Sequence, residues 1–537
     1  MASITSANSR EGSTAASATP TPTPTPSRSV GRDVVLILTC TIAMLTNTAA
    51  SSIGIILPVI GVKLGIRVDQ LQWLISAFSL SSGCLLLLFG RLADLFGRKK
   101  VFLFGTIWLT AFSIGCGFAQ NSTALFILRG LQGVGPAAFI PACLGILAHA
   151  FPPSRARTIA FASFSAGAPL GGAIGMQLGA VLTQYSDAGW RATFFLFAGL
   201  SALCVIGGYY AIDPDQPSTE EDQRVDWIGA FLVTSGLILV VFALAQGPVA
   251  PRGWKTGYII ALLIVGVVLI GLFLVWEHRL EHGEQHRPPL MKLSLWTRAK
   301  GKFAVIQIIA FLEWASFLSW FFWLVVYYEN FRKLSLVHTS IRGLPSTVTG
   351  LFCNVFIVIF VSRVDVGILV AFGTGVTGLA ALLFAIIDPN ATYWSYGFVS
   401  AILGVFGADF VFASGTLFVA KVALPHEQSL AGGIFQTLTQ LGTSFGVAIS
   451  TIVFNSVAGS SSTGEDAPLK AYKAAQWACA GMAFFCSLLA ILFMRGVGPV
   501  GVDERKVASG EGDAESRVST FQKDEKNVAM NGGGGVS

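Results

Sequence analysis

The chain has 537 residues, of which 53% are hydrophobic and only 12% are charged, and its formal net charge is +6. Soluble globular proteins carry roughly 25% charged residues. This composition therefore excludes an ordinary soluble enzyme or binding domain and indicates an integral membrane protein whose main partner is the lipid bilayer. The small positive charge gives no reason to expect nucleic acid as a partner.

Long apolar stretches follow one another along almost the whole chain. About 20 consecutive apolar residues cross a bilayer as a helix, because a helix satisfies its own backbone hydrogen bonds where water is absent. The sequence predicts fourteen transmembrane helices in an all-α polytopic fold, at 34–60, 71–89, 101–119, 124–150, 158–184, 191–212, 227–246, 257–277, 303–327, 344–362, 365–387, 394–421, 430–456 and 474–495. Only a short turn with Arg363 and Asp365 separates the tenth from the eleventh stretch, so a merged or re-entrant segment is an alternative there.

Positive charge is distributed unequally between the two sides of this topology. With the N-terminus inside, 24 of the 35 Lys and Arg residues fall in inside segments and 10 in outside connectors. Because Lys and Arg are retained on the cytoplasmic side, both termini are expected in the cytoplasm. Residues 1–32 are rich in Ser, Thr and Pro, and residues 499–537 mix Gly, Ser and both charge signs, so both are predicted to be disordered tails.

The connector between the second and third stretches has the most informative pattern in the chain. It places Gly90, Leu92, Asp94, Gly97, Arg98 and Lys99 at fixed offsets between two apolar segments. This pattern resembles the cytoplasmic loop between helices 2 and 3 of major facilitator superfamily transporters. The resemblance implies a cytoplasmic gate formed by Gly90, Asp94, Gly97, Arg98 and Lys99. In that family the aspartate pairs with basic groups and a helix terminus of the other half when the cytoplasmic side is shut.

Arg129 lies inside the fourth stretch, and Gln132, Gly133 and Gly135 follow it. The segment resembles the helix 4 motif of the same family, a buried arginine followed by Gln-Gly-x-Gly. An arginine within a membrane is costly unless it is paired or hydrated, so it marks a functional pathway by default. Arg129 and Gln132 are therefore candidates for proton coupling or substrate binding. The alternative is that Arg129 reaches back to the nearby membrane surface.

The fifth stretch carries a second motif, formed by Pro169, Gly171, Gly172 and Gly175. It resembles the motif associated with proton-driven antiporters, and this resemblance favours export. Gly171, Gly175 and Gly179 recur every four residues and give one flat helix face, while Pro169 permits a bend. Ala168 stands where the family usually has glycine.

Two acids lie near the middle of predicted spans, Glu313 in the ninth and Asp409 in the twelfth. An unpaired carboxylate is unstable in hydrocarbon and takes up a proton, as a proton carrier must. Both are therefore candidates for proton coupling or substrate binding. The structural alternative is a hydrogen-bonded acid that seals two helices. Phe317 and Trp320 follow Glu313 at helical spacing, an arrangement that also suits organic cations.

Two further segments narrow the resemblance to a branch of the family. Residues 226–229 and 431–433 look like the fourteen-helix drug:proton antiporters of fungi, and residues 407–409 point to the subgroup with aminotriazole-resistance, boron-efflux and low-affinity ammonium transporters. The branch normally has an aspartate nine residues before its helix 1 proline, whereas this chain has Ala49 before Pro58. Proton coupling is therefore expected at Glu313 or Asp409 rather than in helix 1.

The resemblance also implies a division of the chain into transport units. The expected N-terminal six-helix half occupies 33–212 and the C-terminal six-helix half occupies 301–498, with two inserted helices and their connectors at 213–300. Such halves rock around a central site in alternating access.

Together these patterns predict a secondary transporter, not an enzyme, that exports a drug, toxin or secondary metabolite in exchange for protons. The sequence contains no nucleotide-binding P-loop, so a proton gradient is the expected energy source. No cofactor or metal is expected, because all eight cysteines fall within predicted spans without ligand spacing. We expect a monomer in the plasma membrane, with the vacuolar membrane as an alternative. The functional alternatives are a carrier of a small inorganic or nutrient solute such as ammonium or borate, and a transporter-like nutrient sensor.

Overall fold

The computed structural model describes residues 29–66, 73–152, 154–215, 224–247, 250, 252–282, 289–460 and 467–500. In these residues thirteen helical spans are long and apolar enough to cross a membrane, and there are fourteen if α3 and α4, which are bent by 43° relative to each other, are counted as one span. This confirms the predicted all-α polytopic fold. The α-helices are α1 Val30–Ser51, α2 Leu57–Leu64, α3 Trp73–Cys84, α4 Leu86–Phe96, α5 Arg98–Phe118, α6 Ser122–Ala150, α7 Arg155–Ala173, α8 Gly179–Tyr185, α9 Arg191–Ala211, α10 Trp227–Gln246, α11 Gly257–His282, α12 Ser294–Thr297, α13 Lys302–Val326, α14 Leu336–Phe360, α15 Val366–Ala385, α16 Gly397–Leu403, α17 Phe406–Val422, α18 Gln428–Ser460 and α19 Ala467–Phe493.

Short 3₁₀ and π turns interrupt or extend several spans. They are η1 Ile53–Ile56, η3 Ile174–Leu178, η5 Gly253–Lys255 and η6 Tyr327–Phe331. The first predicted span is shorter than expected, because α1 ends at Ser51 and the turn η1 and the short helix α2 follow it. The predictions of disordered tails fall on residues that lie, apart from a few at their inner ends, outside the described ranges.

The tenth and eleventh predicted spans are two separate helices, α14 and α15. They do not form a hairpin, because α14 packs mainly on α7 whereas α15 packs on α19. Asp365 caps the start of α15, accepting hydrogen bonds from the backbone N–H of Gly367 at 2.7 Å and of Gly498 at 2.7 Å. The acidic residue in the short turn therefore starts one helix and fixes the segment that follows the last one.

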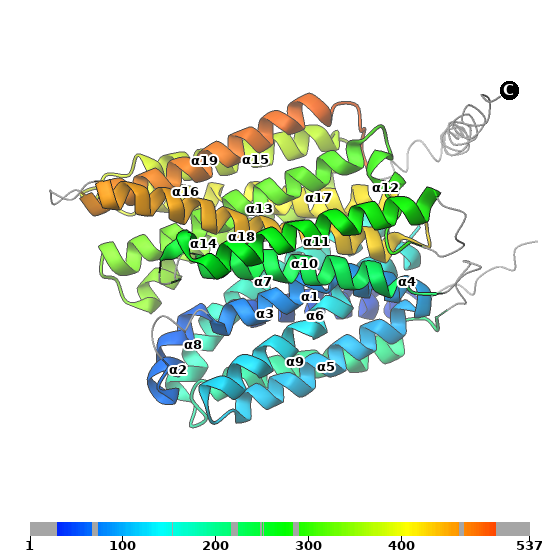
Figure 1. Ribbon diagram of the computed structural model, residues 1–537, viewed down its shortest axis with the longest axis horizontal. Helices are drawn as coiled ribbons and strands as arrows, with labels where there is room; N and C mark the ends of the chain where they lie inside the picture. Colours follow the sequence, from blue (N-terminus) through cyan, green and yellow to red (C-terminus); the bar gives the residue numbers. More distant parts are fainter. Residues whose placement is uncertain are drawn as a thin grey trace, which may run out of the picture.

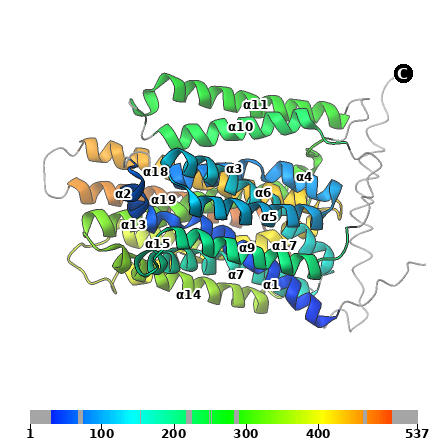
Figure 2. The ribbon, with the colours of Figure 1, turned by 90° about the horizontal axis from the view of Figure 1, so that it is seen from below.

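The helices form two groups that lie side by side (Figure 1). We call residues 30–211 the first half and residues 302–493 the second half. In the first half α5 packs on α6 and α9, and α1 packs on α7; in the second half α13 packs on α18 and α19. The helices α10 and α11 pair with each other and lie on one side of the bundle (Figure 2), where α10 contacts both α3 and α18. They therefore cover the seam between the halves.

Glycines of the fifth-span motif bring α7 against α1 within the first half. A Cβ on Gly167 would lie 2.6 Å from the Thr41 carbonyl oxygen, and one on Gly175 would lie 2.6 Å from the Ala49 carbonyl oxygen. Gly171 lies between them, against the Leu45 backbone. Side chains at these positions would separate the two helices, so the close approach requires glycine.

The predicted glycine stripe ends one turn earlier than the spacing suggested. Gly179 faces Thr193 of α9, not α1. The π turn η3 lies between Gly171 and Gly179 and inserts an extra residue into the helix, which rotates the following face. Pro169 points the other way from the stripe: its Cβ is 3.1 Å from the position that a Cβ on Gly350 of the second half would take.

We predict that Gly171→Ala destabilises the protein by about 1–3 kcal/mol, because the added methyl group meets the backbone of α1. The neighbouring substitution Gly172→Ala is the control, since nothing lies within 4 Å of a Cβ there. It should be neutral or stabilising by up to about 1 kcal/mol, as expected for Gly→Ala in a helix. Thermal unfolding of both purified variants in detergent tests this, and equal midpoints would contradict the packing argument.

Candidate functional site at the contact between the halves

Asp94 at the end of α4 binds the first turn of α18, which belongs to the other half. Its carboxylate oxygens accept hydrogen bonds from the backbone N–H of Ser429 at 3.3 Å and of Leu430 at 2.9 Å. The first N–H groups of a helix have no partner within the helix, and the helix dipole makes this end attractive to an anion. A buried acid of the first half therefore caps a helix of the second half.

Arg98 connects this carboxylate to two further segments. Its guanidinium forms an ion pair with Asp94 at 2.9 Å, donates to the Gly145 carbonyl oxygen at 3.0 Å and donates to the Pro425 carbonyl oxygen. We call Asp94, Arg98 and the N–H groups of Ser429 and Leu430 the latch. Gly90 is needed beside it, because a Cβ there would lie 3.0 Å from the Ser429 carbonyl oxygen.

Gly97 and Lys99 belong to the same predicted gate, but their contacts are with α9 and the segment directly after it, not with the second half. Gly97 has a φ of 112°, in the region that favours glycine, and turns the chain from α4 into α5. The ammonium group of Lys99 donates to the carbonyl oxygens of Tyr209 at 2.8 Å and Ile212 at 2.6 Å, at the end of α9. These two residues therefore orient the latch without touching the other half.

Asp215 is a site residue that the sequence interpretation missed. It accepts hydrogen bonds from the backbone N–H of Lys99 at 2.8 Å and of Lys100 at 3.1 Å, and so caps the start of α5. In the sequence it is one acid in an acidic connector. An acid shortly after a span gives a weak signal for capping, but nothing local shows which helix it caps.

Glu427, directly before α18, forms a second charged group at the latch end of the bundle. Its carboxylate lies 2.7 Å from an Arg298 nitrogen and 3.4 Å from the Lys292 ammonium. Burial alone raises the pKa of this carboxyl group, but hydrogen bonds from His426 and Arg298 and the charges of Arg298 and Lys292 lower it to about 2. Glu427 therefore stays ionised throughout the physiological range and holds the start of α18 in place.

Arg157 makes another contact between the halves at this end. It lies in the first turn of α7 and is only 8% exposed. Its guanidinium donates to the carbonyl oxygen of Ala420 near the end of α17, at 3.0 Å. A cation thus meets the negative end of a helix in the second half, as an anion meets the positive end in the latch.

Asp409 lies close to the seam, near the middle of the bundle. Its carboxylate accepts a hydrogen bond from the Asn354 side-chain amide at 3.1 Å. The same amide donates to the Gly350 carbonyl oxygen at 2.9 Å. A Cβ on Gly350 would be 2.8 Å from an Asp409 oxygen and 3.1 Å from Pro169 of the first half. Only a glycine therefore separates this acid from α7.

Glu313 is fully buried, but its nearest described neighbours belong to its own half. A Cβ on Gly407 would meet one of its carboxylate oxygens, and Thr377 adjoins the same position. Neither oxygen has a hydrogen-bond partner in the described part of the chain. Trp320, predicted to share a cation site with Glu313, instead donates to the Ser400 hydroxyl at 3.1 Å inside the second half.

Arg129 lies in the interior of the first half and is not exposed at all, so it does not reach back to the membrane surface. Its guanidinium donates to the carbonyl oxygens of Leu74 at 2.7 Å and Ala50 at 3.0 Å and to the Gln132 side chain at 2.7 Å. Gln132 in turn donates to the Ser113 hydroxyl at 2.7 Å. This network connects α1, α3, α5 and α6 and satisfies the buried charge.

Comparison with protein families assigns this architecture. The profile of the Major Facilitator Superfamily matches residues 39–250 and 218–447. The chain belongs to the major facilitator superfamily. It is therefore a multi-pass membrane transporter and not an enzyme, as the resemblance of the loop at 90–99 implied.

Fungal members of the superfamily are similar to this transporter over most of its length. The low affinity ammonium transporter of Saccharomyces cerevisiae is 30% identical, with 81% of this chain and 83% of that protein covered. The efflux pump terJ of Aspergillus terreus is 26% identical over 86% of this chain and 88% of that protein. The aminotriazole resistance protein of Saccharomyces cerevisiae is 25% identical over 86% of this chain and 84% of that protein.

A solved structure has the same fold. The human organic anion transporter MFSD10 matches 85% of this transporter and 99% of its own chain, with a TM-score of 0.60 and 15% sequence identity. The likeness extends across both halves, in agreement with the helix packing described above.

We predict that Asp94→Asn opens the latch end of the transporter. The substitution removes the negative charge from the start of α18 and leaves Arg98 without its ion-pair partner. Spin labels on Phe96→Cys and Leu424→Cys, two exposed positions in the two halves, should then give a larger fraction of long distances in pulsed electron resonance. Asp215→Asn is the matched control, because it removes the cap of α5, a contact that does not involve the second half. An unchanged distance distribution in Asp94→Asn would refute the latch.

We predict that Glu427 contributes stability above about pH 4.5, its ordinary pKa, and that this contribution is lost as pH falls toward 2. The direction follows because the folded-state pKa is lower than the ordinary value. At neutral pH Glu427→Gln should destabilise by roughly 3 kcal/mol, since it breaks a buried ion pair. Thermal unfolding of Glu427→Gln and of the wild type from pH 3 to pH 8 should show a constant difference in midpoint temperature above pH 5.5. This difference should become smaller at lower pH. A gap that changes between pH 6 and pH 8 would contradict this assignment.

Proposed function

We propose that this transporter exports small organic compounds in exchange for protons by alternating access. In this proposal the latch end faces the cytoplasm, in agreement with the positive charge of its connectors. The two halves rock against each other, and the latch holds the cytoplasmic end shut. Export requires this end to open so that the central site can bind substrate from the cytoplasm again. We further propose a monomer in the plasma membrane.

The position of Asp409 carries the proposal of proton coupling. In the described part of the chain its carboxylate pairs with an amide and with no cation. Asp409 is only 7% exposed at its position beside Gly350 and Pro169, and a buried carboxylate without a cation is costly unless water reaches it. Proton binding therefore favours the closed seam, and proton release favours its separation. A group that biases two conformations in this way couples a gradient to movement.

Glu313 has a different environment, and we propose a structural role for it. Its described neighbours Thr377 and Gly407 lie on helices of the same half, so rocking of the halves does not bring water to it. Arg129 is proposed to be structural for the same reason, because its partners belong to the first half. Of the intramembrane charges predicted from the sequence, we therefore propose Asp409 as the one that responds to movement.

The direction and the substrate are proposed from two further observations. The fifth-span motif with Pro169 and Gly171 resembles that of antiporters, and one similar protein is named an efflux pump. Both favour export of an organic compound. The second candidate is transport of a small inorganic or nutrient solute such as ammonium or borate, since a similar protein at 30% identity is named a low affinity ammonium transporter.

Purified transporter in liposomes with an imposed pH gradient separates the two candidates. Ethidium and aminotriazole serve as organic probes, and methylammonium and borate serve as small-solute probes. Movement of an organic probe with dissipation of the gradient supports export. Movement of methylammonium or borate alone supports the second candidate, and absence of all fluxes contradicts both.

We predict that Asp409→Asn lowers gradient-driven accumulation of the transported probe at least tenfold while exchange of probe across the membrane continues. The amide keeps the shape of the side chain but cannot release a proton. Glu313→Gln is the matched control and should retain gradient-driven transport within about twofold. Loss of coupling in Glu313→Gln with normal coupling in Asp409→Asn would reverse the proposed roles.

A further inference from the structure

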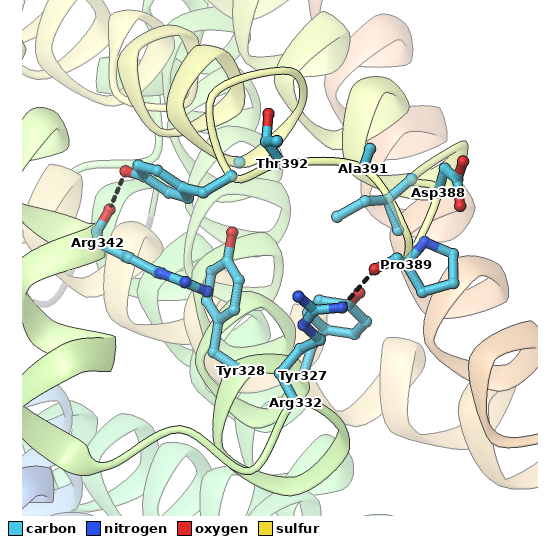
Figure 3. A pocket seen from close by; sticks show the side chains of 11 residues that line it. Tyr327, Tyr328, Arg332, Arg342, Asp388, Pro389, Ala391 and Thr392 are labelled. Atoms are coloured by element: carbon cyan, nitrogen blue, oxygen red, sulfur yellow. Dashed lines mark hydrogen bonds between the residues drawn. The ribbon is translucent and has the colours of Figure 1, made fainter.

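The end of the second half opposite the latch has a small cavity beside Arg332 and Arg342 (Figure 3). Its volume is about 20 Å³, which is room for one water molecule. Tyr327 and Tyr328 in its lining are only 2% and 3% exposed and pack on other rings. Arg332 donates to the Pro389 carbonyl oxygen. The charged groups at this end therefore fasten the connectors and leave no space for an organic ligand.

Two acids meet at the latch end, where α10 begins and α11 ends. Asp226 caps α10, and its carboxylate accepts hydrogen bonds from the Gly229 backbone N–H at 3.1 Å and from the Trp276 indole N–H at 3.0 Å. Glu277 follows Trp276 in α11 and is fully buried. A Cβ on Gly229 would lie 2.8 Å from a Glu277 carboxyl oxygen and would also meet an Asp226 oxygen. The two carboxyl groups therefore adjoin the same point beside α10.

One Glu277 oxygen lacks a hydrogen bond. Oε2 accepts from the Met291 backbone N–H at 3.3 Å, whereas Oε1, the atom nearest Gly229, has no partner in the part of the chain that the structure describes. Buried polar atoms are nearly always hydrogen-bonded, because an unsatisfied one loses its water without compensation. A proton on Glu277 turns this oxygen into a donor, and the Asp226 carboxylate beside it is the acceptor.

The charges that face Glu277 come from two other helices. Asp226 lies at the start of α10, and Arg91 of α4 is itself buried, with 4% exposure. Of these two charges, that of Asp226 acts on Glu277 more strongly. In the described residues, the segment after α11 reaches Glu277 through backbone N–H groups. Because two carboxylates at such a position repel each other, the pair favours one shared proton.

We propose that Asp226 and Glu277 form a proton-binding site that controls the connector at 289–298. With the proton bound, the Glu277 hydroxyl donates to an Asp226 oxygen, and the pair holds the start of α10 against the end of α11. On release, the O–H bond of Glu277 breaks, the proton passes to water at the latch end, and the two carboxylates repel each other. The site is separate from Asp409. Only the statement that cytoplasmic pH sets its occupancy rests on the proposed function.

The connector at 289–298 transmits this change to the latch. It begins at α11, where Met291 donates to Glu277, and ends at Arg298, which pairs with Glu427 directly before α18. Separation of α10 from α11 therefore loosens the segment that positions the start of α18. Because Asp94 caps this same helix, a rise in pH weakens the latch.

A purely structural role for Glu277 gives a different expectation. Its carboxylate would then be ionised at every pH near neutrality and would only hold Met291 of the connector. Removal of the charge would loosen the connector equally at all pH values. The pH dependence of the connector position, measured without transport, distinguishes the two roles.

Spin labels on Phe231→Cys of α10 and Ser294→Cys of the connector test the proposal in purified full-length transporter without a membrane gradient. Both positions are exposed, and the eight native cysteines are buried. Pulsed electron resonance should show an at least twofold larger fraction of long distances at about pH 9 than at about pH 6, because the proton is lost over this range. In Glu277→Gln the low-pH distribution should persist at both values, since the neutral amide still donates to Asp226.

Glu281→Gln is the matched control. Glu281 lies one turn after Glu277 and accepts hydrogen bonds from the connector at Leu293 and Ser294, but it is not part of the acid pair. This variant should keep the pH dependence of the wild type.

Asp226→Asn should move the transition to lower pH by at least about one unit, because an ionised Glu277 then faces no second carboxylate. This variant decides if Glu277→Gln does not yield folded protein, and an unchanged transition in it would overturn the proposal. A wild-type distribution that does not change with pH would overturn it as well. So would an unchanged pH dependence in Glu277→Gln, which would assign the effect to the histidines at 278, 282 and 426. None of these results requires solute flux, which the liposome experiment tests independently.

Discussion

The structure depends on one contact, the carboxylate of Asp94 at the start of α18. Through it, a buried acid of the first half satisfies two backbone N–H groups of the second half. Arg98 joins the same acid to the connector before α18, and Arg157 makes a parallel contact with the end of α17. These three contacts lie at one end of the bundle, whereas Ser340 of α14 donates to Gln177 of η3 elsewhere along the contact between the halves. Packing of α18 on α4 and α6 and of α14 on α7 completes the contact between the halves.

The size of this interaction suits a contact that, in the proposed alternating-access cycle, breaks repeatedly. A charge at a helix terminus is worth about 0.3–2 kcal/mol, and hydrogen bonds to a charged group are worth about 1.5–3 kcal/mol each. A latch of a few kcal/mol keeps one end closed most of the time, yet a proton or substrate with a modest preference for the open form can release it. An apolar interface of similar extent would have no comparable point of control.

The buried charges divide according to where they lie relative to the seam between the halves. Arg129 is surrounded by partners within the first half, and Glu313 lies among helices of the second half. Asp409 lies at the seam, one glycine away from Pro169. Burial alone therefore does not identify a coupling residue. A buried acid responds to alternating access only if the movement changes its exposure to water, and that depends on its distance from the seam.

The sequence by itself determined the membrane spans, because hydrophobicity and helix length are local properties that a bilayer requires of each segment. Its resemblance to the loop between helices 2 and 3 of major facilitator superfamily transporters also singled out Asp94 and the glycines around it. Only the tertiary structure decided that Asp94 caps a helix 336 positions away, that Asp215 and Glu427 support the latch, and that Asp409 rather than Glu313 lies at the seam. Membrane helices are apolar on nearly every face, so their rotation and partners are set by packing between distant segments and not by periodicity.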